Sequence, residues 1–333
     1  MTTLTPVVPD TGMATPSRKR NLRASLTFDK ISLFLVFLGL PLVLYAVFVV
    51  SPFFQAIGYS FTDWNGFTDK MNNVGLNNYT KLFQDELFLR AMRNNILLAI
   101  VLPLVIVTLS LALATMITVA GRSVGEISGL KGASFYRVVS FFPYTIPAIV
   151  VGIMWGQIFD PSAGLVNGVL TRLGFEQFES FAWLGNVKTA MPVTMFIIIW
   201  GFIGFYMILF IAAVKGIPSE IYEAARIDGA GRFRTAISIT LPLIRENVQT
   251  AYIYIGIMAL DAYVYMQALN PFGGPDNSTL TMPQYLMTTA FEKSQFGLAC
   301  AMGVMMGILT GIFAAIVFTV NRLSGGKDQV TMA

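Results

Sequence analysis

The sequence predicts an all-α membrane protein, a bundle of six transmembrane helices with both chain ends in the cytoplasm. Three observations predict it. Of the 333 residues, 55% are hydrophobic and only 12% are charged, whereas a soluble domain carries about 25% charged residues. Six apolar runs are each long enough to cross a bilayer. The basic residues gather in alternate segments between these runs, which sets the orientation.

Each predicted span is an apolar run bounded by charged residues and exceeds the roughly 20 residues that a spanning helix needs. The predicted spans are 31–56, 94–121, 138–159, 189–214, 247–275 and 294–321. Prolines lie within or at the starts of several of them: Pro41, Pro103, Pro143, Pro147 and Pro192. We expect neighbouring helices of the bundle to satisfy the carbonyls that these prolines leave free.

Lys and Arg favour an N-in, C-in orientation, because cytoplasmic segments carry an excess of both. With the N-terminus inside, the cytoplasmic segments hold Arg18, Lys19, Arg20, Arg23, Lys30, Arg122, Lys131, Arg137, Lys215, Arg226, Arg232, Arg234, Arg245, Arg322 and Lys327. The outer segments hold Lys70, Lys81, Arg90, Arg93, Arg172, Lys188 and Lys293. The opposite orientation would place the larger group outside.

The polar ends do not add a folded domain. Residues 1–29 are rich in Thr and Pro and end in a basic cluster, which predicts a disordered cytoplasmic tail. Residues 30–323 form the membrane domain, and 324–333 form a short cytoplasmic tail. The first apolar run follows basic residues like a signal peptide, but it is too long and shows no small-residue cleavage site. We expect it to be a retained helix.

The composition argues against catalysis. The chain contains no His, the commonest general base and metal ligand. Its one cysteine, Cys300, lies in an apolar run and is expected to be a packing residue. No Gly-x-x-x-x-Gly-Lys-[Ser/Thr] phosphate loop is present, since Gly326-Lys327-Asp328 lacks the pattern. We therefore expect no enzyme activity, no metal site, no cofactor and no nucleic-acid partner.

The segment 215–245, between the fourth and fifth spans, has the marks of a helix start. Pro218 suits an early helical position, and the Ser219 hydroxyl can cap free backbone N–H groups. Glu220 and Glu223 fall in the first turns, where they complement the positive end of the helix dipole.

The same segment then ends its helix and begins another. Ala224 and Ala225 keep one face flat, and Gly229 and Gly231 are expected to end the helix because glycine adopts left-handed backbone geometry readily. The result is a compact helical knob that could dock into a cleft of another protein. From these features alone, an amphipathic loop resting on the membrane surface is the favoured interpretation.

The sequence motif within the segment decides between the two interpretations. Residues 223–244, EAARIDGAGRFRTAISITLPLI, closely resemble the EAA loop of ABC importer permeases. The matching residues are Glu223, Ala224, Ala225, Asp228, Gly229, Ala230, Ile239, Leu241 and Pro242. The resemblance implies that this loop couples the membrane subunit to an ATPase, with Glu223, Ala224, Ala225, Asp228 and Gly229 as the coupling residues.

Further motifs resemble the carbohydrate-uptake permeases, such as those for maltose, lactose, glycerol phosphate and chitooligosaccharides. They are Asp228-Gly229-Ala230, Gly273-Gly274-Pro275 followed by Thr279, Gly75-Leu76-Asn77-Asn78-Tyr79, and Phe142-Pro143-Tyr144 with Ile146-Pro147. The resemblance covers roughly residues 30–322. Polar residues that some relatives carry in the fourth and fifth spans are replaced here, so the resemblance does not identify the substrate.

The resemblance also implies partners and a location. The expected assembly contains a second permease subunit, with a heterodimer favoured over a homodimer, two ATP-binding subunits and an extracytoplasmic solute-binding protein. It would import a sugar through the bacterial plasma membrane, in contact with membrane lipid. ATP-driven closure of the ATPase dimer would pull the two EAA loops together.

The fifth span offers a candidate pathway for a sugar. Four candidate residues of this span are spaced three or four residues apart, so they share one face of a continuous helix. Two aromatic residues of the fourth span are added to them. The candidates are Tyr254, Met258, Asp261, Tyr265, Phe205 and Tyr206. Aromatic rings pack on the C–H faces of sugars, and a carboxylate accepts bonds from hydroxyls. Asp261 could instead belong to a structural ion pair or a water cavity.

Small residues at four-residue spacing mark the sixth span. Gly303, Gly307 and Gly311 lie between Ala299 and Ala315 in this series, and such a stripe lets helix backbones approach closely. We expect it to pack on another helix, either of this chain or of the partner permease.

Two other functions stay open. An ABC permease for an amino acid or peptide would share the EAA loop. An ion-coupled secondary carrier would be expected to show internal repeats and more intramembrane polar groups, and neither it nor a membrane anchor explains the EAA loop.

Overall fold

The computed structural model describes residues 32–68, 70–119 and 132–323. The predicted tails, 1–29 and 324–333, lie outside these residues. The described chain is mostly helical and contains no strand; one isolated antiparallel bridge joins Thr62 and Asn73. The chain divides into two units, Met1–Phe54 and Gln55–Ala333.

The first predicted span is a continuous helix, Ser32–Tyr59, with a mean hydropathy of 2.8 in its most apolar stretch. It contains α2 (Leu40–Tyr45) and α3 (Ser51–Tyr59). Pro41 follows a π-helical turn, Leu35–Gly39, an adjustment that helps to satisfy backbone groups near a proline.

Three more helices are long and apolar enough to cross a membrane: α5 (Glu86–Val119), α9 (Ala190–Lys215) and α16 (Phe296–Leu323). They match the second, fourth and sixth predicted spans. Helix α5 begins eight residues before the predicted residue 94 because Asp85 caps it: the Leu87 N–H donates to Asp85 Oδ1 at 2.9 Å. Pro103 lies inside α5 without breaking it.

The third predicted span is not one straight helix. Helices α6 (Ala133–Phe141) and α7 (Ala148–Ile158) are bent by 98° at a short break. Pro143 lies in a 3₁₀ turn within the break and Pro147 directly precedes α7. Proline cannot donate to the helical ladder and restricts the residue before it, so two of them four residues apart interrupt the helix.

The fifth predicted span is also bent, by 49°, between α13 (Arg245–Leu260) and α14 (Tyr263–Leu269). It ends at Leu269 rather than at residue 275, because residues 271–277 form two short 3₁₀ turns. If each bent pair is one span, length and composition allow six spans, the predicted number.

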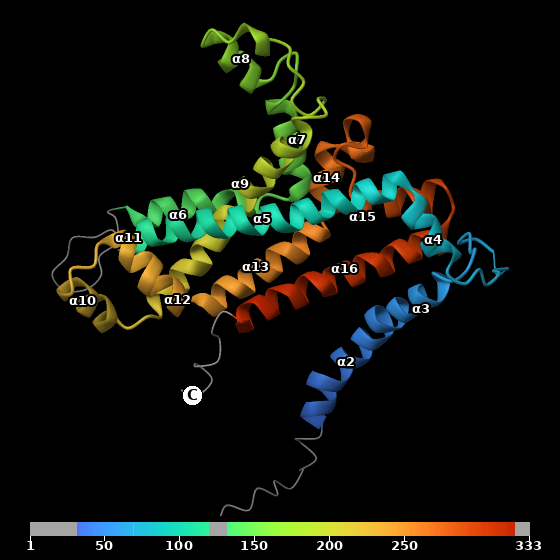
Figure 1. The fold of residues 1–333 in the computed structure, drawn as a ribbon, viewed down its shortest axis with the longest axis horizontal. Helices are drawn as coiled ribbons and strands as arrows, with labels where there is room; N and C mark the ends of the chain where they lie inside the picture. The colour runs from blue at the N-terminus through green and yellow to red at the C-terminus, as the bar shows by residue number, and fades with distance from the viewer. Residues whose placement is uncertain (1–31, 69, 120–131, 324–333) are drawn as a thin grey trace, which may run out of the picture. The chain divides into compact units, whose positions relative to one another are not determined.

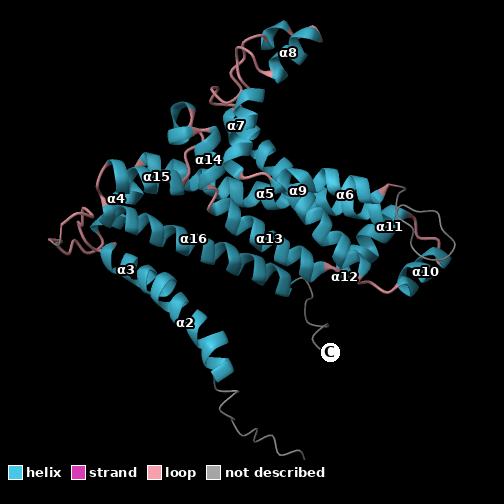
Figure 2. Ribbon diagram, turned by 180° about the vertical axis from the view of Figure 1, so that it is seen from behind, coloured by secondary structure: helices cyan, strands magenta, loops and turns pink. Residues whose placement is uncertain are grey.

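The main core lies where α5 packs along α9 and α13 (Figure 1, Figure 2). Its fully buried side chains include Leu102, Ile106, Ile198, Phe210 and Ile255. One polar bond crosses it: the Ser110 hydroxyl donates to the Ile203 carbonyl at 2.8 Å. A buried hydroxyl in such a core needs a partner, and here the partner ties α5 to α9.

A second core closes the predicted outer end of the bundle. It joins α4 (Asn77–Gln84), α15 (Met282–Met287) and the first turns of α5 and α16. The Tyr285 hydroxyl donates to Asp85 Oδ2 at 2.5 Å. Burial, together with this carboxylate, raises the pKa of Tyr285. The bond holds α15 against the start of α5.

Close helix contacts depend on isolated glycines. A Cβ on Gly204 of α9 would lie 1.7 Å from the Ser140 carbonyl oxygen. A Cβ on Gly152 would lie 2.4 Å from the Ala268 Cβ of α14, and one on Gly256 would lie 2.1 Å from the Phe313 ring of α16. These positions permit the close backbone approach that small residues provide in membrane helices.

The predicted small-residue stripe of α16 makes few such contacts within this unit. Gly303 has one neighbour, Leu286, at 3.7 Å from its ideal Cβ. Gly307 and Gly311 are exposed. The packing role of Gly303, Gly307 and Gly311 therefore stays a prediction. A helix of a partner permease is the alternative neighbour for this stripe.

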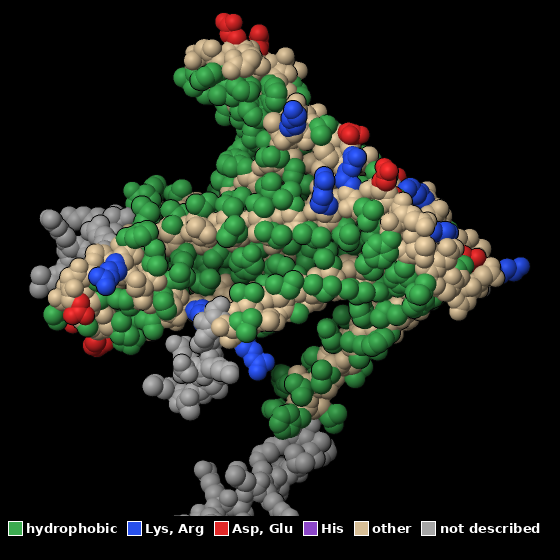
Figure 3. All heavy atoms as spheres, viewed as in Figure 1, with side chains coloured by type: hydrophobic (Ala, Val, Ile, Leu, Met, Phe, Trp, Pro, Cys, Tyr) green, Lys and Arg blue, Asp and Glu red, His purple; other side chains and the backbone are tan. Residues whose placement is uncertain are grey.

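The surface of the second unit has the character of a membrane protein. Figure 3 shows hydrophobic side chains over much of the visible face of this unit, with charged side chains gathered toward the two ends of the bundle. Exposed apolar residues along its spans include Leu104, Phe196 and Ile312. Such a surface suits lipid or a partner helix rather than water.

The orientation is testable with reporter fusions. Fusions at Lys131 and Arg232 should report the cytoplasm, and fusions at Lys81 and Gln284 should report the outside, because of the excess of basic residues in the inner segments. Helices α4 and α15, which carry Lys81 and Gln284, contribute to one core, so these two fusions should agree. A cytoplasmic signal at Gln284 would rule out the fifth or the sixth span as a crossing.

Candidate functional site

The EAA-like segment forms a short helix at the end of α9. Helix α10 spans Ser219–Ile227, close to its predicted start. Pro218 is the residue that precedes the helix, with extended ψ of 138°, and no side chain caps its N-terminus. The predicted cap by Ser219 is therefore wrong: Ser219 is already helical, so its hydroxyl cannot reach forward as an N-cap does. Glu220 lies in the first turn, as expected.

Gly229 ends α10 in the left-handed conformation, with φ of +73°. The Asp228 N–H donates to the Ala224 carbonyl at 3.0 Å, and the Ala230 N–H donates to the Ala225 carbonyl at 2.9 Å. This is a glycine-terminated helix end, and it confirms the expected conformation of Gly229.

Gly231 does not share this role. It has no positive φ, and its carbonyl accepts from the Thr235 N–H at 2.9 Å. It therefore precedes the next helix, α11 (Arg232–Thr235), instead of ending α10. One glycine is enough to end the helix, so the second is free to lead into α11.

Helix α10 is fixed to the bundle through one face. Tyr222 is 3% exposed and belongs to the main core together with Val214 of α9 and Ile244. Its hydroxyl lies 3.1 Å from the Thr240 hydroxyl, which is fully buried. Burial raises the pKa of Tyr222, so it stays a neutral phenol. A displacement of α10 would therefore act on the core directly.

The opposite face of α10 is exposed. Glu223, Ala224 and Asp228 are all exposed, whereas Ala225 is buried beneath them. The predicted coupling residues thus divide into a surface group and one anchor. The surface group consists of two acidic residues and one small residue, and Arg226 and Ile227 are exposed beside it.

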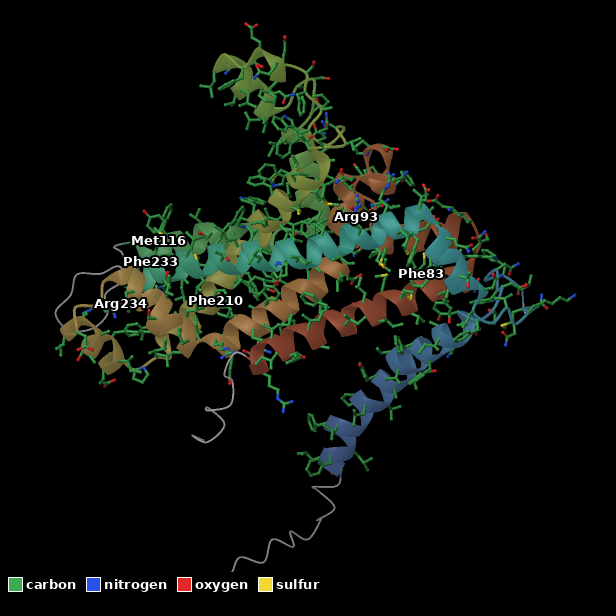
Figure 4. All side chains as sticks on the ribbon, viewed as in Figure 1. Phe83, Arg93, Met116, Phe210, Phe233 and Arg234 are labelled. Carbon is green, nitrogen blue, oxygen red and sulfur yellow. The ribbon has the colours of Figure 1, made fainter. Side chains whose placement is uncertain are left out.

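Two large apolar side chains at this end of the bundle were not predicted. Ile227 is 87% exposed and Phe233 is 79% exposed. Figure 4 shows Phe233 beside Arg234 near the end of α5 that carries Met116. An isolated exposed hydrophobic residue is ordinary; these two lie within seven residues of one loop. Their signal in the sequence was an apolar residue on each side of Gly229.

The pathway candidates on α9 join an aromatic cluster at the break of the third span. Tyr144 stacks on Phe205 with ring centroids 4.4 Å apart. Phe202 lies between Tyr144 and Tyr265, at 5.6 and 6.0 Å. Tyr206 contacts Phe205 edge to face. The cluster therefore brings together both discontinuous spans, through Tyr144 and Tyr265. Tyr144 and Phe202 were not among the predicted pathway residues.

The predicted shared face of the fifth span is interrupted. Helix α13 ends at Leu260, and α14 begins at Tyr263 after the bend, so Tyr265 does not continue the α13 face of Tyr254 and Met258. The physical reason is the break itself, which abolishes the three- and four-residue register. Tyr265 packs with the aromatic cluster instead.

Asp261 sits at the break, directly after the last residue of α13. Its neighbours on α13 differ: Tyr254 is 65% exposed, whereas Met258 packs against the main core. Asp261 is exposed, and no ion pair involving it lies within 4.0 Å among the described residues, where Arg90 and Asp276 form the one such pair. An exposed carboxylate within a span must face water or a polar partner.

Two buried polar side chains form hydrogen bonds on either side of α14, next to the break of the fifth span. Asn95 of α5 donates to the Leu260 carbonyl at 2.7 Å and accepts from the Met282 N–H at 2.7 Å. Asn270, at the end of α14, donates to the Thr194 hydroxyl at 2.6 Å. Sequence reasoning missed these two residues because an isolated Asn in or beside an apolar run carries no spacing signal. Within the described chain no group of three or more His, Cys, Asp or Glu forms a metal site.

Known proteins resemble this chain over most of its length. The family model of the binding-protein-dependent transport system inner membrane component matches residues 117–326. The diacetylchitobiose uptake system permease protein NgcF of Streptomyces coelicolor is 60% identical, over 93% of this chain and 88% of that protein. The multiple sugar-binding transport system permease protein MsmF of Streptococcus mutans is 30% identical, over 86% of this chain and 94% of that protein.

A solved structure shares the fold. A chain in the crystal structure of a bacterial ABC transporter involved in the import of the acidic polysaccharide alginate aligns with a TM-score of 0.74 at 22% identity. The alignment covers 88% of this chain and 96% of that chain. At this identity the likeness establishes the architecture alone.

The backbone of Gly229 provides a test of the exposed loop. Gly229→Val should distort the end of α10, since a β-branched residue at this φ costs about 1 kcal/mol or more. The six spans should still insert, yet substrate uptake and the stimulation of ATP hydrolysis should be lost.

Gly231→Val is the matched control, because Gly231 lies two residues away, has no positive φ and has no heavy atom within 4 Å of its ideal Cβ. Uptake and membrane content would be measured in the same cells. Normal uptake by Gly229→Val would remove the coupling role from this helix end.

Proposed function

The chain belongs to the family of binding-protein-dependent transport system inner membrane components, and we propose that it is the permease subunit of an ABC importer that carries a sugar or oligosaccharide across the bacterial cytoplasmic membrane. The observation that supports the coupling role most is the two-sided helix α10. Tyr222 anchors one side in the core, and Glu223, Ala224 and Asp228 are exposed on the other.

The partners follow from this role. A second permease subunit, most simply a different chain, would complete the pathway. Two ATP-binding subunits would receive the α10 helices, and an extracytoplasmic solute-binding protein would deliver the sugar. This chain would perform no chemistry and hold no cofactor. ATP binding would select one of two global states of the assembly.

Helix α10 would transmit the motion of the ATPase. Tyr222 and Thr240 join it to the segment that leads into α13, and α13 ends at the break beside Asp261. A pull on α10 would thus reach the discontinuous fifth span through one packed element. Packed cores switch between discrete arrangements rather than deforming continuously.

The substrate would be a neutral sugar. A relative that is 60% identical is a diacetylchitobiose permease, and diacetylchitobiose is an uncharged disaccharide with two N-acetyl groups. Aromatic rings such as Tyr144 and Tyr265 can pack on sugar C–H faces, and Asp261 can accept from hydroxyl or amide donors. The same carboxylate would repel an acidic sugar.

An amino-acid or peptide permease is the nearest alternative. Permease relatives are named for diacetylchitobiose, for multiple sugars and for xylose and arabinose, which favours the sugar, although UgpA is named for sn-glycerol-3-phosphate. An ion-coupled carrier would need no EAA-like loop. Uptake that persists without ATP would favour such a carrier.

Asp261→Asn tests the role of the carboxylate. Asn keeps the shape and still accepts and donates hydrogen bonds, but it loses the charge-assisted bonds that are about twice as strong. In cells that depend on this permease, uptake of diacetylchitobiose should fall or its sugar preference should change, while the amount of assembled complex stays at the wild-type level.

Asp276→Asn is the control, since it also removes one exposed carboxylate from a residue in a turn outside the spans. The ion pair that it loses with Arg90 is exposed and therefore contributes little to stability. Membrane-assembled complex and uptake would be measured in the same cells. Loss of assembly with Asp261→Asn would point to a structural ion pair instead. Unchanged uptake and unchanged preference would also contradict a substrate role.

A further inference from the structure

The hydrogen-bond ladder of the fifth span stops at Leu260. The Asp261 N–H donates to the Ile257 carbonyl at 3.1 Å, which closes the last turn of α13. Beyond the break, the Tyr263 N–H donates to the Asp261 carbonyl at 2.8 Å, and the Met266 N–H donates to the Ala262 carbonyl at 3.3 Å. The Leu260 carbonyl falls between these two ladders, and Leu260 is 4% exposed, so this carbonyl needs a partner within the protein.

A side chain of α5 satisfies this carbonyl. Asn95 is 1% exposed, and its Nδ2 donates to the Leu260 carbonyl at 2.7 Å. Its Oδ1 accepts from the Met282 N–H, also at 2.7 Å. Because one partner is an acceptor and the other a donor, the reversed amide orientation would oppose like groups on both sides. Asn95 therefore bridges two backbone segments in one fixed orientation.

The other end of α14 is held as well. Asn270 donates from Nδ2 to the Thr194 hydroxyl at 2.6 Å, and Gln284 donates to the Asn270 carbonyl at 3.0 Å. The seven residues of α14 thus lie between two polar clamps, one on each side. Tyr265, in the middle of α14, belongs to the aromatic cluster.

We infer that Asn95 is a positioning residue: it holds the break of the fifth span open beside Asp261 and ties it to the start of α15. This inference rests on the proposed function in one respect, namely that Asp261 and Tyr265 face the solute. Asn95 does not itself touch the solute. It sets where the carboxylate and the aromatic ring lie relative to each other.

The neighbouring residue provides a matched control. Asn94 is 5% exposed and also makes two bonds, from Nδ2 to the Ser278 carbonyl at 3.0 Å and to the Leu280 carbonyl at 2.8 Å. It lies on the same helix and binds the same kind of partner. Its bonds reach the outer loop and not the break.

The test compares Asn95→Leu with Asn94→Leu in the assembled transporter. Each variant replaces a buried amide by an apolar side chain of similar size and strands two backbone groups. Hydrogen–deuterium exchange would be measured over residues 261–269 and 278–287, and uptake of diacetylchitobiose would be measured over a range of sugar concentrations.

We expect Asn95→Leu to speed exchange in 261–269 by about tenfold or more, the equivalent of about 1.4 kcal/mol, and to raise the KM for uptake or change the sugar preference. Asn94→Leu should speed exchange in 278–281 and leave both 261–269 and the sugar preference unchanged. If Asn95→Leu does not assemble, Asn95→Ser, which keeps one hydroxyl donor, replaces it. The same changes in exchange and uptake are then expected, each of smaller magnitude.

Three results would overturn the inference: wild-type exchange over 261–269 in the Asn95 variant, the same pattern in both variants, or faster exchange with unchanged uptake. A failure of both Asn95 variants to assemble would also overturn it, because a positioning residue must leave the fold intact. Exchange does not depend on the substrate, so a wrong proposed function would show as absent uptake by the wild-type transporter with the exchange contrast still present.

Discussion

The structure depends on one constraint, the need of every backbone N–H and C=O in a bilayer for a partner inside the protein. Uninterrupted helices such as α9 meet it by themselves. The third and fifth spans do not, because each is broken, and their freed groups must be satisfied by neighbouring elements. Asn95 does so for Leu260. The close seat of Gly204 against Ser140 places α9 directly on the end of the broken α6.

The proposed solute pathway lies at the two breaks. Irregular backbone at membrane depth is tolerated where it is buried in protein or lines a cavity, and binding sites of transporters often lie at discontinuous helices. Here the two breaks contribute Tyr144 and Tyr265 to one aromatic cluster, and Asp261 lies at one of them. Helix α10 is connected to the same core through Tyr222, so the proposed coupling helix and the proposed pathway share one packed body.

The sequence was informative about the spans and the coupling helix. Apolar length alone located α5, α9 and α16, and the glycine at 229 marked the end of α10 because only a left-handed residue allows that turn. Hydropathy says nothing of continuity, however. The two prolines at 143 and 147 were a signal for the 98° bend, whereas Asp261 was the one sign of a break in the fifth span.

Other features could not be predicted from spacing. The tight glycine contacts are single residues, such as Gly204 and Gly256, whose partners lie far away in the sequence. The regular stripe at Gly303, Gly307 and Gly311 was conspicuous, but Gly303 meets one neighbour, Gly311 has no heavy atom within 4 Å of its ideal Cβ, and Gly307 is exposed. Asn95 is one polar residue near the end of an apolar run, and its importance follows only from the carbonyl that it meets in three dimensions.

In the proposed mechanism this chain moves a sugar because ATPase subunits move α10. The most direct measurement is uptake of labelled diacetylchitobiose into proteoliposomes that contain the purified transporter, with ATP on the ATPase side and the loaded solute-binding protein on the other. The labelled sugar should accumulate above its external concentration only when both ATP and the binding protein are present. Uptake that needs an ion gradient and proceeds without ATP would contradict it.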